Sequence, residues 1–156
     1  MVDEIANQGA TNLNPGQRPS VMIVDDDAEM RALLRDVLGR DGFHVREHSS
    51  GDGLVPLLEG WTPDAIVLDK EVAGANGLDL LSYIRRRLPS TPVVFVTAFG
   101  GSEVEAEALK LGVTCYMDKP FRVARLVEVL RAAVNQATPT VEGAGGQVWG
   151  VGGDRT

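Results

Sequence analysis

Residues Asp64 to Lys70 constrain the fold more than any other stretch of this chain. Four apolar residues, Ala65 to Leu68, lie between Pro63 and a loop that contains two glycines. A short apolar run with β-branched residues and turn residues on both sides indicates a strand buried on both faces, as in a parallel sheet. The run ends in Asp69, at the carboxyl end of the strand, where open α/β sheets bind their ligands.

Similar apolar runs recur along the chain, and a helical pattern follows each of them. Strands are predicted over 20–24, 43–48, 65–69, 93–97 and 113–117, and helices over 30–38, 54–58, 78–88, 102–111 and 123–134. Helix-length connections between consecutive strands imply right-handed crossovers. The five β-α units therefore predict an α/β fold, a doubly wound parallel sheet with helices on both faces. The more polar second strand is expected at an edge of the sheet.

Two helix starts carry informative residues. If Asp52 or Gly53 caps the second predicted helix, Pro56 falls among its first four residues, whose amides need no intrahelical partner; otherwise Pro56 kinks the helix. Ser102 and Glu105 have the spacing of a capping box and predict the start of the fourth helix.

The composition predicts a single soluble domain. The chain has 156 residues, of which 44% are hydrophobic and 24% charged, as is ordinary for a globular protein. Its formal net charge of −7 argues against nucleic acid or an anionic membrane as the main partner. No apolar run reaches the ~18 residues of a membrane-spanning helix. One cysteine, Cys115, excludes an intrachain disulfide and, with no secretory pattern, favours a cytoplasmic location.

The composition changes near both ends of the chain. Residues 1–19 are polar and are expected to form a disordered extension, and residues 20–135 are expected to form the domain. Residues 136–156 are rich in glycine and are expected to form a flexible tail, because they cannot bury enough apolar surface to order themselves.

Polar groups follow four of the five predicted strands. These groups are Asp25 and Asp26, Asp69, Thr97 and Lys119. Neighbouring strands lie roughly 4.8 Å apart, so the groups at the ends of adjacent strands can converge on one site. Carboxylates bind Mg²⁺ through oxygen, and another carboxylate can attack phosphorus. A hydroxyl and an ammonium can hold phosphoryl oxygens.

The same residues form the motifs of a known family. They are Asp25-Asp26, Asp69, Gly77-Leu78, Thr97-Ala98 and Lys119-Pro120-Phe121. From Ser20 to about Val134 the chain resembles the receiver domain of bacterial two-component response regulators, and in particular the single-domain chemotaxis regulator. The resemblance implies a flavodoxin-like (βα)5 fold with strand order 2-1-3-4-5.

The resemblance implies a role for each matched residue. Asp69 would accept a phosphoryl group from the phosphohistidine of a sensor histidine kinase or a histidine phosphotransfer protein. Asp26 and Asp69 would bind Mg²⁺ directly, Asp25 would act mostly through water, and the backbone carbonyl of Glu71 would complete the protein's ligands. Lys119 would pair with the phosphoryl oxygens.

The resemblance also implies a conformational switch. Thr97 would move toward the phosphoryl group, and Tyr116 would swing into the space left behind. The change would be expressed on the face formed by the fourth helix, fifth strand and fifth helix of the domain, which would bind a downstream protein or a second copy. The bond before Pro120 would be cis.

The chain departs from the family after the acceptor. The family usually has Met-Pro where this chain has Val72-Ala73, so a looser loop is expected. Glu71 and Phe99 occupy two variable positions that tune how water reaches the acyl phosphate, and they leave its lifetime open.

Simpler roles are expected for several other residues. Asp27 would cap the first helix, and Lys70 would be a solvated charge. The cations of Arg85 to Arg87 would stabilise the end of their helix. Cys115 would be a small buried apolar residue, and Trp149 would have no docking role.

Three functions are compatible with these residues. The first is a phosphorylation switch without enzymatic turnover of an external substrate, with no direct nucleic-acid or membrane partner. The second is a phosphatase resembling the haloacid dehalogenase superfamily, although Glu29 breaks that superfamily's first-strand motif, Asp-x-Asp-x-Thr/Val. The third is a receiver fragment whose output domain lies outside this chain.

Overall fold

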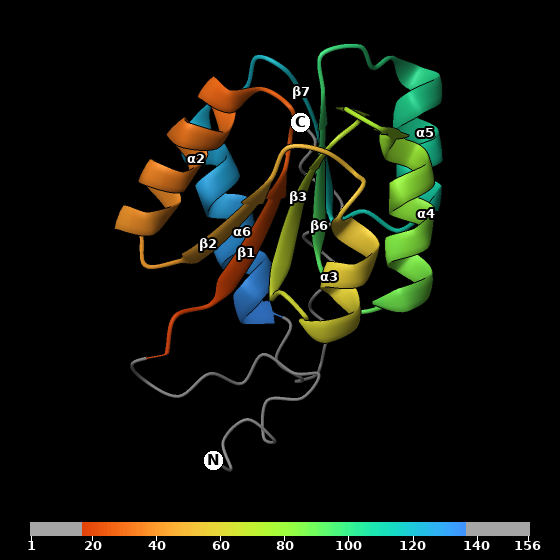
Figure 1. Ribbon diagram of the computed structural model, residues 1–156. Coiled ribbons are helices and arrows are strands. Elements are labelled where there is room, and N and C mark those ends of the chain that lie inside the picture. Colours follow the sequence, from red (N-terminus) through yellow and green to blue (C-terminus); the bar gives the residue numbers. More distant parts are fainter. Residues whose placement is uncertain (1–16, 137–156) are drawn as a thin grey trace.

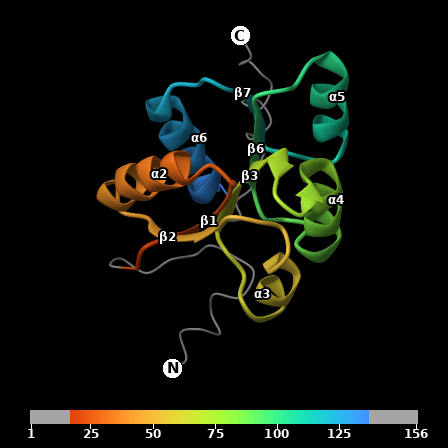
Figure 2. The ribbon, with the colours of Figure 1, turned by 45° about the horizontal axis from the view of Figure 1, so that its top comes forward.

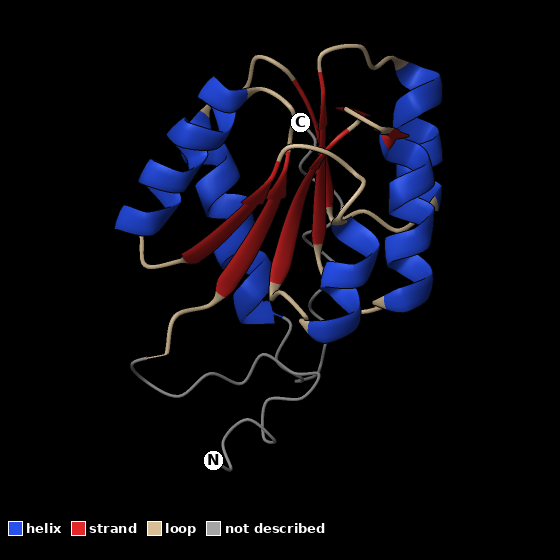
Figure 3. Ribbon diagram, viewed as in Figure 1, coloured by secondary structure: helices blue, strands red, loops and turns tan. Residues whose placement is uncertain are grey.

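The computed structural model describes residues 17–136 and places them in three layers, a central sheet with helices on both faces (Figures 1 and 3). The elements are β1 (Ser20–Val24), α2 (Ala28–Arg40), β2 (His44–His48), α3 (Leu54–Gly60), β3 (Ala65–Asp69), β4 (Glu71–Val72), β5 (Ala75–Asn76), α4 (Gly77–Arg87), β6 (Val93–Thr97), α5 (Ser102–Lys110), β7 (Cys115–Asp118) and α6 (Val123–Gln136). The predicted boundary at residue 135 falls one residue before the end of α6. The predictions for residues 1–16 and 137–156, including Trp149, concern residues outside those that the structure describes.

The main sheet has five parallel strands in the order β2-β1-β3-β6-β7. Counting only these strands, the order is 2-1-3-4-5, which confirms the predicted fold class. Strand β3 lies at the centre and is buried throughout. Strand β2 lies at an edge and has no fully buried residue, as its polar sequence predicts.

Alternate residues of the strands supply two hydrophobic clusters, one on each face of the sheet. In β3, Ala65 and Val67 pack with α2 and α6, whereas Ile66 and Leu68 pack with α3 and α4. Figure 2 shows the same division, with α2 and α6 on one side and α3, α4 and α5 on the other. A strand with apolar residues at both alternating positions buries all of them only when it lies between two layers of helices.

The helix starts only partly follow the sequence predictions. Helix α3 begins at Leu54 after Gly53, so Pro56 is its third residue, where its missing amide is tolerated. Asp27 caps α2 by accepting hydrogen bonds from two amides of the first turn. The predicted capping box of α5 is wrong, because Ser102 is already helical and Gly101, with φ 120°, occupies the cap without a side-chain hydrogen bond.

The segment after β3 forms an element that the sequence did not predict. Strands β4 and β5 pair as a short antiparallel hairpin, in which Val72 of β4 is buried. Ala73 makes a parallel bridge with Ser50, and its carbonyl accepts a hydrogen bond from Gly51 at 3.0 Å. Backbone pairing thus attaches this loop to the loop that precedes α3, and its looseness relative to the family stays a prediction.

Within residues 17–136, none of the helices combines the length and the apolar character needed to cross a membrane.

Candidate functional site

The ends of the parallel strands bring the predicted site residues to one edge of the sheet. In the register, Val24 pairs with Leu68, Asp69 with Val96, and Thr97 with Asp118. The carboxyl ends of β1, β3, β6 and β7 are therefore level with one another. This arrangement assembles the site from residues that are far apart in the sequence.

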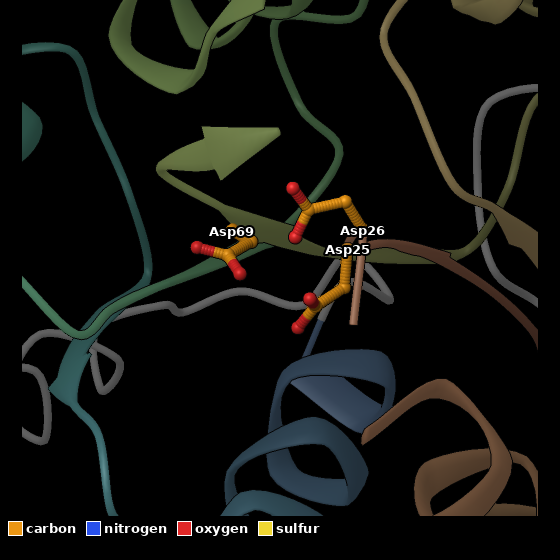
Figure 4. A group of neighbouring side chains, drawn as sticks. All are labelled: Asp25, Asp26 and Asp69. Carbon is orange, nitrogen blue, oxygen red and sulfur yellow. The ribbon is translucent and has the colours of Figure 1, made fainter. Parts of the chain in front are cut away.

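Three carboxylates form the acidic part of the site (Figure 4). One oxygen from each of Asp25, Asp26 and Asp69 lies within 4.8 Å of the others. Asp25 and Asp69 are buried and Asp26 is exposed. The amide of Asp27 donates to Asp25 Oδ1 at 2.9 Å and fixes the orientation of that carboxylate. An all-oxygen donor set of this kind suits a hard cation such as Mg²⁺.

Lys119 supplies the positive charge of the site. Its Nζ lies 2.8 Å from Asp69 Oδ2 and 3.1 Å from Asp25 Oδ2. The Lys119–Pro120 peptide bond is cis. Burial lowers the pKa of Lys119, but the hydrogen bonds to Asp69 and Asp25 outweigh that effect and raise it above its usual value. The side chain is therefore an ammonium between two carboxylates.

The environment of Asp69 is short of positive charge. The pKa of Asp69 is raised to about 7, mainly by burial and to a smaller extent by the charge of Asp25. The hydrogen bonds from Lys119 and from the Glu71 amide, the latter at 3.0 Å, lower the pKa but do not offset the burial. A divalent cation at the three carboxylates would supply the missing positive charge, so the donor set and the electrostatics both fit Mg²⁺.

Thr97 is fully buried at the end of β6, but its hydroxyl is not directed to Asp69. Thr97 Oγ1 lies 3.1 Å from both carboxylate oxygens of Glu71, to which it donates. It also accepts a hydrogen bond from the Phe99 amide at 2.9 Å. Thr97 is thus linked to Asp69 through Glu71, whose amide donates to the Asp69 carboxylate.

Tyr116 lies farther from the carboxylates, beside Gly100. Its ring stacks against Phe95 with a centroid distance of 6.3 Å, and its hydroxyl donates to Asp118 Oδ1 at 3.1 Å. A Cβ atom on Gly100 would lie 1.8 Å from that hydroxyl and 3.0 Å from Thr97 Cγ2. The missing side chain of Gly100 therefore lets the tyrosine hydroxyl approach the loop that follows Thr97.

Gly77 connects the loop of the acceptor to α4. Its amide donates to the Lys70 carbonyl at 2.7 Å. A Cβ atom on Gly77 would lie 2.3 Å from Lys70 Cα and 2.7 Å from the Asp69 carbonyl oxygen. Only glycine permits this approach of the helix to the backbone beside Asp69.

The sequence analysis missed the contacts made by the side chain of Glu71. It considered the backbone carbonyl of Glu71 as a metal ligand and Lys70 as a solvated charge. In the structure, Lys70 is half-buried and its Nζ lies 3.2 Å from Glu71 Oε2. The adjacent pair of opposite charges directly after the acceptor was the available signal.

The fold and the site together define a class of protein: a doubly wound α/β domain with a buried carboxylate, an acidic cluster and a lysine at the carboxyl edge of its sheet. A family model described as "Response regulator receiver domain" matches residues 21–131. The chain belongs to this family, which acts in two-component signalling.

Several characterised proteins are similar to this chain. The response regulator protein PilR of Pseudomonas aeruginosa is 34% identical over 81% of this chain, which spans 28% of PilR. The transcriptional regulatory protein FixJ of Bradyrhizobium diazoefficiens is 30% identical over 78% of this chain, which spans 60% of FixJ. This chain thus matches only part of the length of these relatives.

Solved structures show the same fold. The receiver domain of NtrX from Brucella abortus superposes with a TM-score of 0.68 and 28% identity, covering 74% of this chain and 98% of that domain. A CheY-like receiver domain from Methanospirillum hungatei gives a TM-score of 0.74 at 20% identity, covering 78% and 97% of the two chains.

Proposed function

We propose that this chain is a phosphorylation-dependent switch whose acceptor is Asp69. The observation that carries the proposal is the position of the Asp69 carboxylate, which is buried, 2.8 Å from Lys119 Nζ, and grouped with Asp25 and Asp26. Few carboxylates in a folded domain have both an ammonium and a hard-cation donor set beside them. That combination supports attack on phosphorus.

The phosphoryl donor is the phosphohistidine of a sensor histidine kinase or of a histidine phosphotransfer protein. A carboxylate oxygen of Asp69 forms a bond to phosphorus as the phosphorus–nitrogen bond breaks. The bonding electron pair goes to the imidazole nitrogen. The leaving imidazole is neutral if its other ring nitrogen already carries a proton, and otherwise takes a proton from solvent. Lys119 holds a phosphoryl oxygen and stabilises the negative charge on it.

Asp25, Asp26, Asp69 and the backbone carbonyl of Glu71 would hold Mg²⁺. The bound ion would supply positive charge to the phosphoryl oxygens. This set is the metal-binding part of the proposal.

Thr97 and Tyr116 carry the change to the surface. Thr97 turns toward the phosphoryl group, and Tyr116 moves toward the vacated space. In the labels of Figure 1 the responding face is α5, β7 and α6. This face binds a downstream protein or a second copy of the chain in the cytoplasm. Partner capture with and without beryllium fluoride, which mimics the phosphoryl group, would detect that binding.

The proposal is tested by labelling with acetyl phosphate in the presence of Mg²⁺. The intact protein should gain one phosphoryl group by mass, and Asp69→Asn should gain none. Asp36→Asn, at an exposed position of α2, is the matched control and should be labelled normally. Labelling of Asp69→Asn would show that the acceptor is misassigned, and repeated turnover of a phosphate ester would favour the phosphatase alternative.

A further inference from the structure

The carboxylate of Glu71 accepts the hydrogen bond that the Thr97 hydroxyl donates. A threonine hydroxyl has one proton to donate, and in this structure that proton is directed to Glu71, with Oγ1 3.1 Å from both carboxylate oxygens. The same oxygen accepts a hydrogen bond from the Phe99 amide at 2.9 Å. Thr97 is fully buried, so water does not compete for its hydroxyl.

Glu71 is held in place from two directions. Its backbone amide donates to Asp69 Oδ1 at 3.0 Å, and this hydrogen bond fixes the Glu71 backbone beside Asp69. At the other end, Lys70 Nζ lies 3.2 Å from Oε2. The Glu71 side chain is 34% exposed, so its carboxylate retains contact with solvent while it binds the hydroxyl. A partly solvated carboxylate can move into solvent when the Thr97 hydroxyl turns away from it.

We propose that Glu71 is a positioning residue that holds Thr97 in the unphosphorylated arrangement and competes with the phosphoryl group for the Thr97 hydroxyl. The inference rests on the proposed function of Asp69 and adds a regulatory contact at the same site. A hydroxyl with one proton serves only one anionic acceptor at a time. The Glu71 contact must therefore break before Thr97 can donate to a phosphoryl oxygen.

Charge makes the two arrangements mutually exclusive. A phosphoryl group on Asp69 brings about two negative charges next to a residue whose amide already contacts Asp69. Repulsion between that group and the Glu71 carboxylate favours release of the glutamate. Lys70 remains available to neutralise the released side chain. Glu71 thus acts as a latch that stabilises the resting state until phosphorylation displaces it.

The resting-state contact is tested without any phosphodonor. The amide of Phe99 donates to Thr97 Oγ1, so its NMR shift reports the orientation of that hydroxyl. Glu71→Ala should shift the Phe99 amide resonance, and Glu71→Gln, which keeps an acceptor oxygen, should shift it less. Glu103→Ala, at an exposed position of α5, should leave it unchanged. An unchanged resonance in Glu71→Ala would overturn the inference.

The competition is tested by the initial rate of labelling with acetyl phosphate. Glu71→Ala should raise this rate by about three- to tenfold, since hydrogen bonds to charged groups are strong but Glu71 is partly exposed. In the Thr97→Ala background, the same change should have little effect, because no hydroxyl remains to be released. An equal acceleration in both backgrounds would show that Glu71 acts only through its charge, and no acceleration would show no competition; either result overturns the inference.

The two proposals fail in different ways. If the unaltered protein is not labelled, the function proposed for Asp69 is wrong, and the Phe99 amide measurement still decides whether Glu71 orients Thr97. If the protein is labelled and the rates do not depend on Glu71, only the latch is wrong.

Discussion

Lys119 Nζ lies 2.8 Å from Asp69 Oδ2, although 50 residues separate the two in the chain. The contact spans the distance from the central strand β3 to the residue after the edge strand β7. It exists because β6 and β7 continue the sheet in parallel and end at the same level as β3. The contact places the ammonium of Lys119 directly on the proposed acceptor.

Lys119→Met should therefore slow labelling of Asp69 by acetyl phosphate by about a hundredfold, the typical effect of removing one oriented donor from developing negative charge. Lys110→Met removes an equal charge from an exposed position of α5 and should leave the rate within a factor of two, roughly the effect of one distant surface charge. The initial rate measured by mass spectrometry is the readout. A rate in Lys119→Met equal to that of Lys110→Met would exclude the assigned role.

Asp26→Asn should weaken Mg²⁺ binding by about tenfold or more, because it removes one of three clustered carboxylates. Asp26 is exposed, whereas Asp25 and Asp69 are buried, so the change should not disturb the fold. Isothermal titration calorimetry gives the affinity, with Asp36→Asn as the matched control. An affinity equal to that of the control would place the ion elsewhere.

Gly77→Ala should destabilise the domain by about 1–3 kcal/mol, the usual range for overpacking. The added Cβ would lie 2.3 Å from Lys70 Cα, a backbone atom that cannot turn aside. Urea denaturation provides the free energy of unfolding.

Gly39→Ala is the matched control for that measurement. Gly39 lies inside α2, and an added Cβ there would meet no atom within 4 Å. Alanine is favoured over glycine in a helix, so this variant should gain about 0.5–1 kcal/mol. Shifts of the same sign in the two variants would contradict the packing described for Gly77.

Asp118→Asn should lower the pKa of Tyr116. Burial and the hydrogen bond and charge of Asp118 raise the pKa of this phenol to about 12. Removing the charge should bring the pKa part of the way back, and burial should keep it above about 10. Spectrophotometric titration in a Tyr83→Phe background isolates the signal, because the chain has two tyrosines.

The same shift determines how stability depends on pH. The folded-state pKa of Tyr116 lies above the unfolded-state value, so the unfolded chain loses its proton first as the pH rises. The tyrosine therefore reduces stability progressively between about pH 10 and 12. Asp118→Asn should reduce this loss, and an unaltered alkaline unfolding curve together with an unaltered pKa would show that Asp118 has no influence on Tyr116.

The sequence predicted the sheet well because burial on both faces leaves a simple pattern. The sequences of β1, β3 and β6 are apolar at both alternating positions. Each of these strands ends at a site residue or directly before one. Strand β7 was less well placed: it begins at Cys115 rather than Val113. Of its first expected residues, Val113 packs in the core, and Thr114 hydrogen-bonds to the Val93 backbone at the start of β6. Periodicity does not distinguish such contacts from the register of the strand itself.

Other features depended on contacts that no local pattern contains. Strands β4 and β5 have two residues each, too few for any periodicity, and they are held by the bridge between Ala73 and Ser50. Arg85 was expected to favour the end of α4 through its charge, and it does so by donating to the carbonyls of Leu88, Pro89 and Thr91. Such partners are defined only after the chain has folded.

The hydrogen bond between Glu71 and Thr97 is the clearest case. Both residues were considered at the sequence level, but for separate roles. Their contact depends on the path of the backbone after Asp69, where the Glu71 amide donates to Asp69 Oδ1 and the Gly77 amide donates to the Lys70 carbonyl. A short sequence window around Thr97 contains none of these residues.

The acidic cluster begins directly after the first strand, and the lysine that contacts it follows the last strand, 94 residues beyond Asp25. During synthesis on the ribosome, a nascent chain therefore carries its acceptor carboxylate long before it carries the ammonium. Only a polypeptide that has emerged past β7 possesses the whole constellation. Translation products that end before Lys119 would consequently lack the ammonium that the proposed phosphoryl transfer requires.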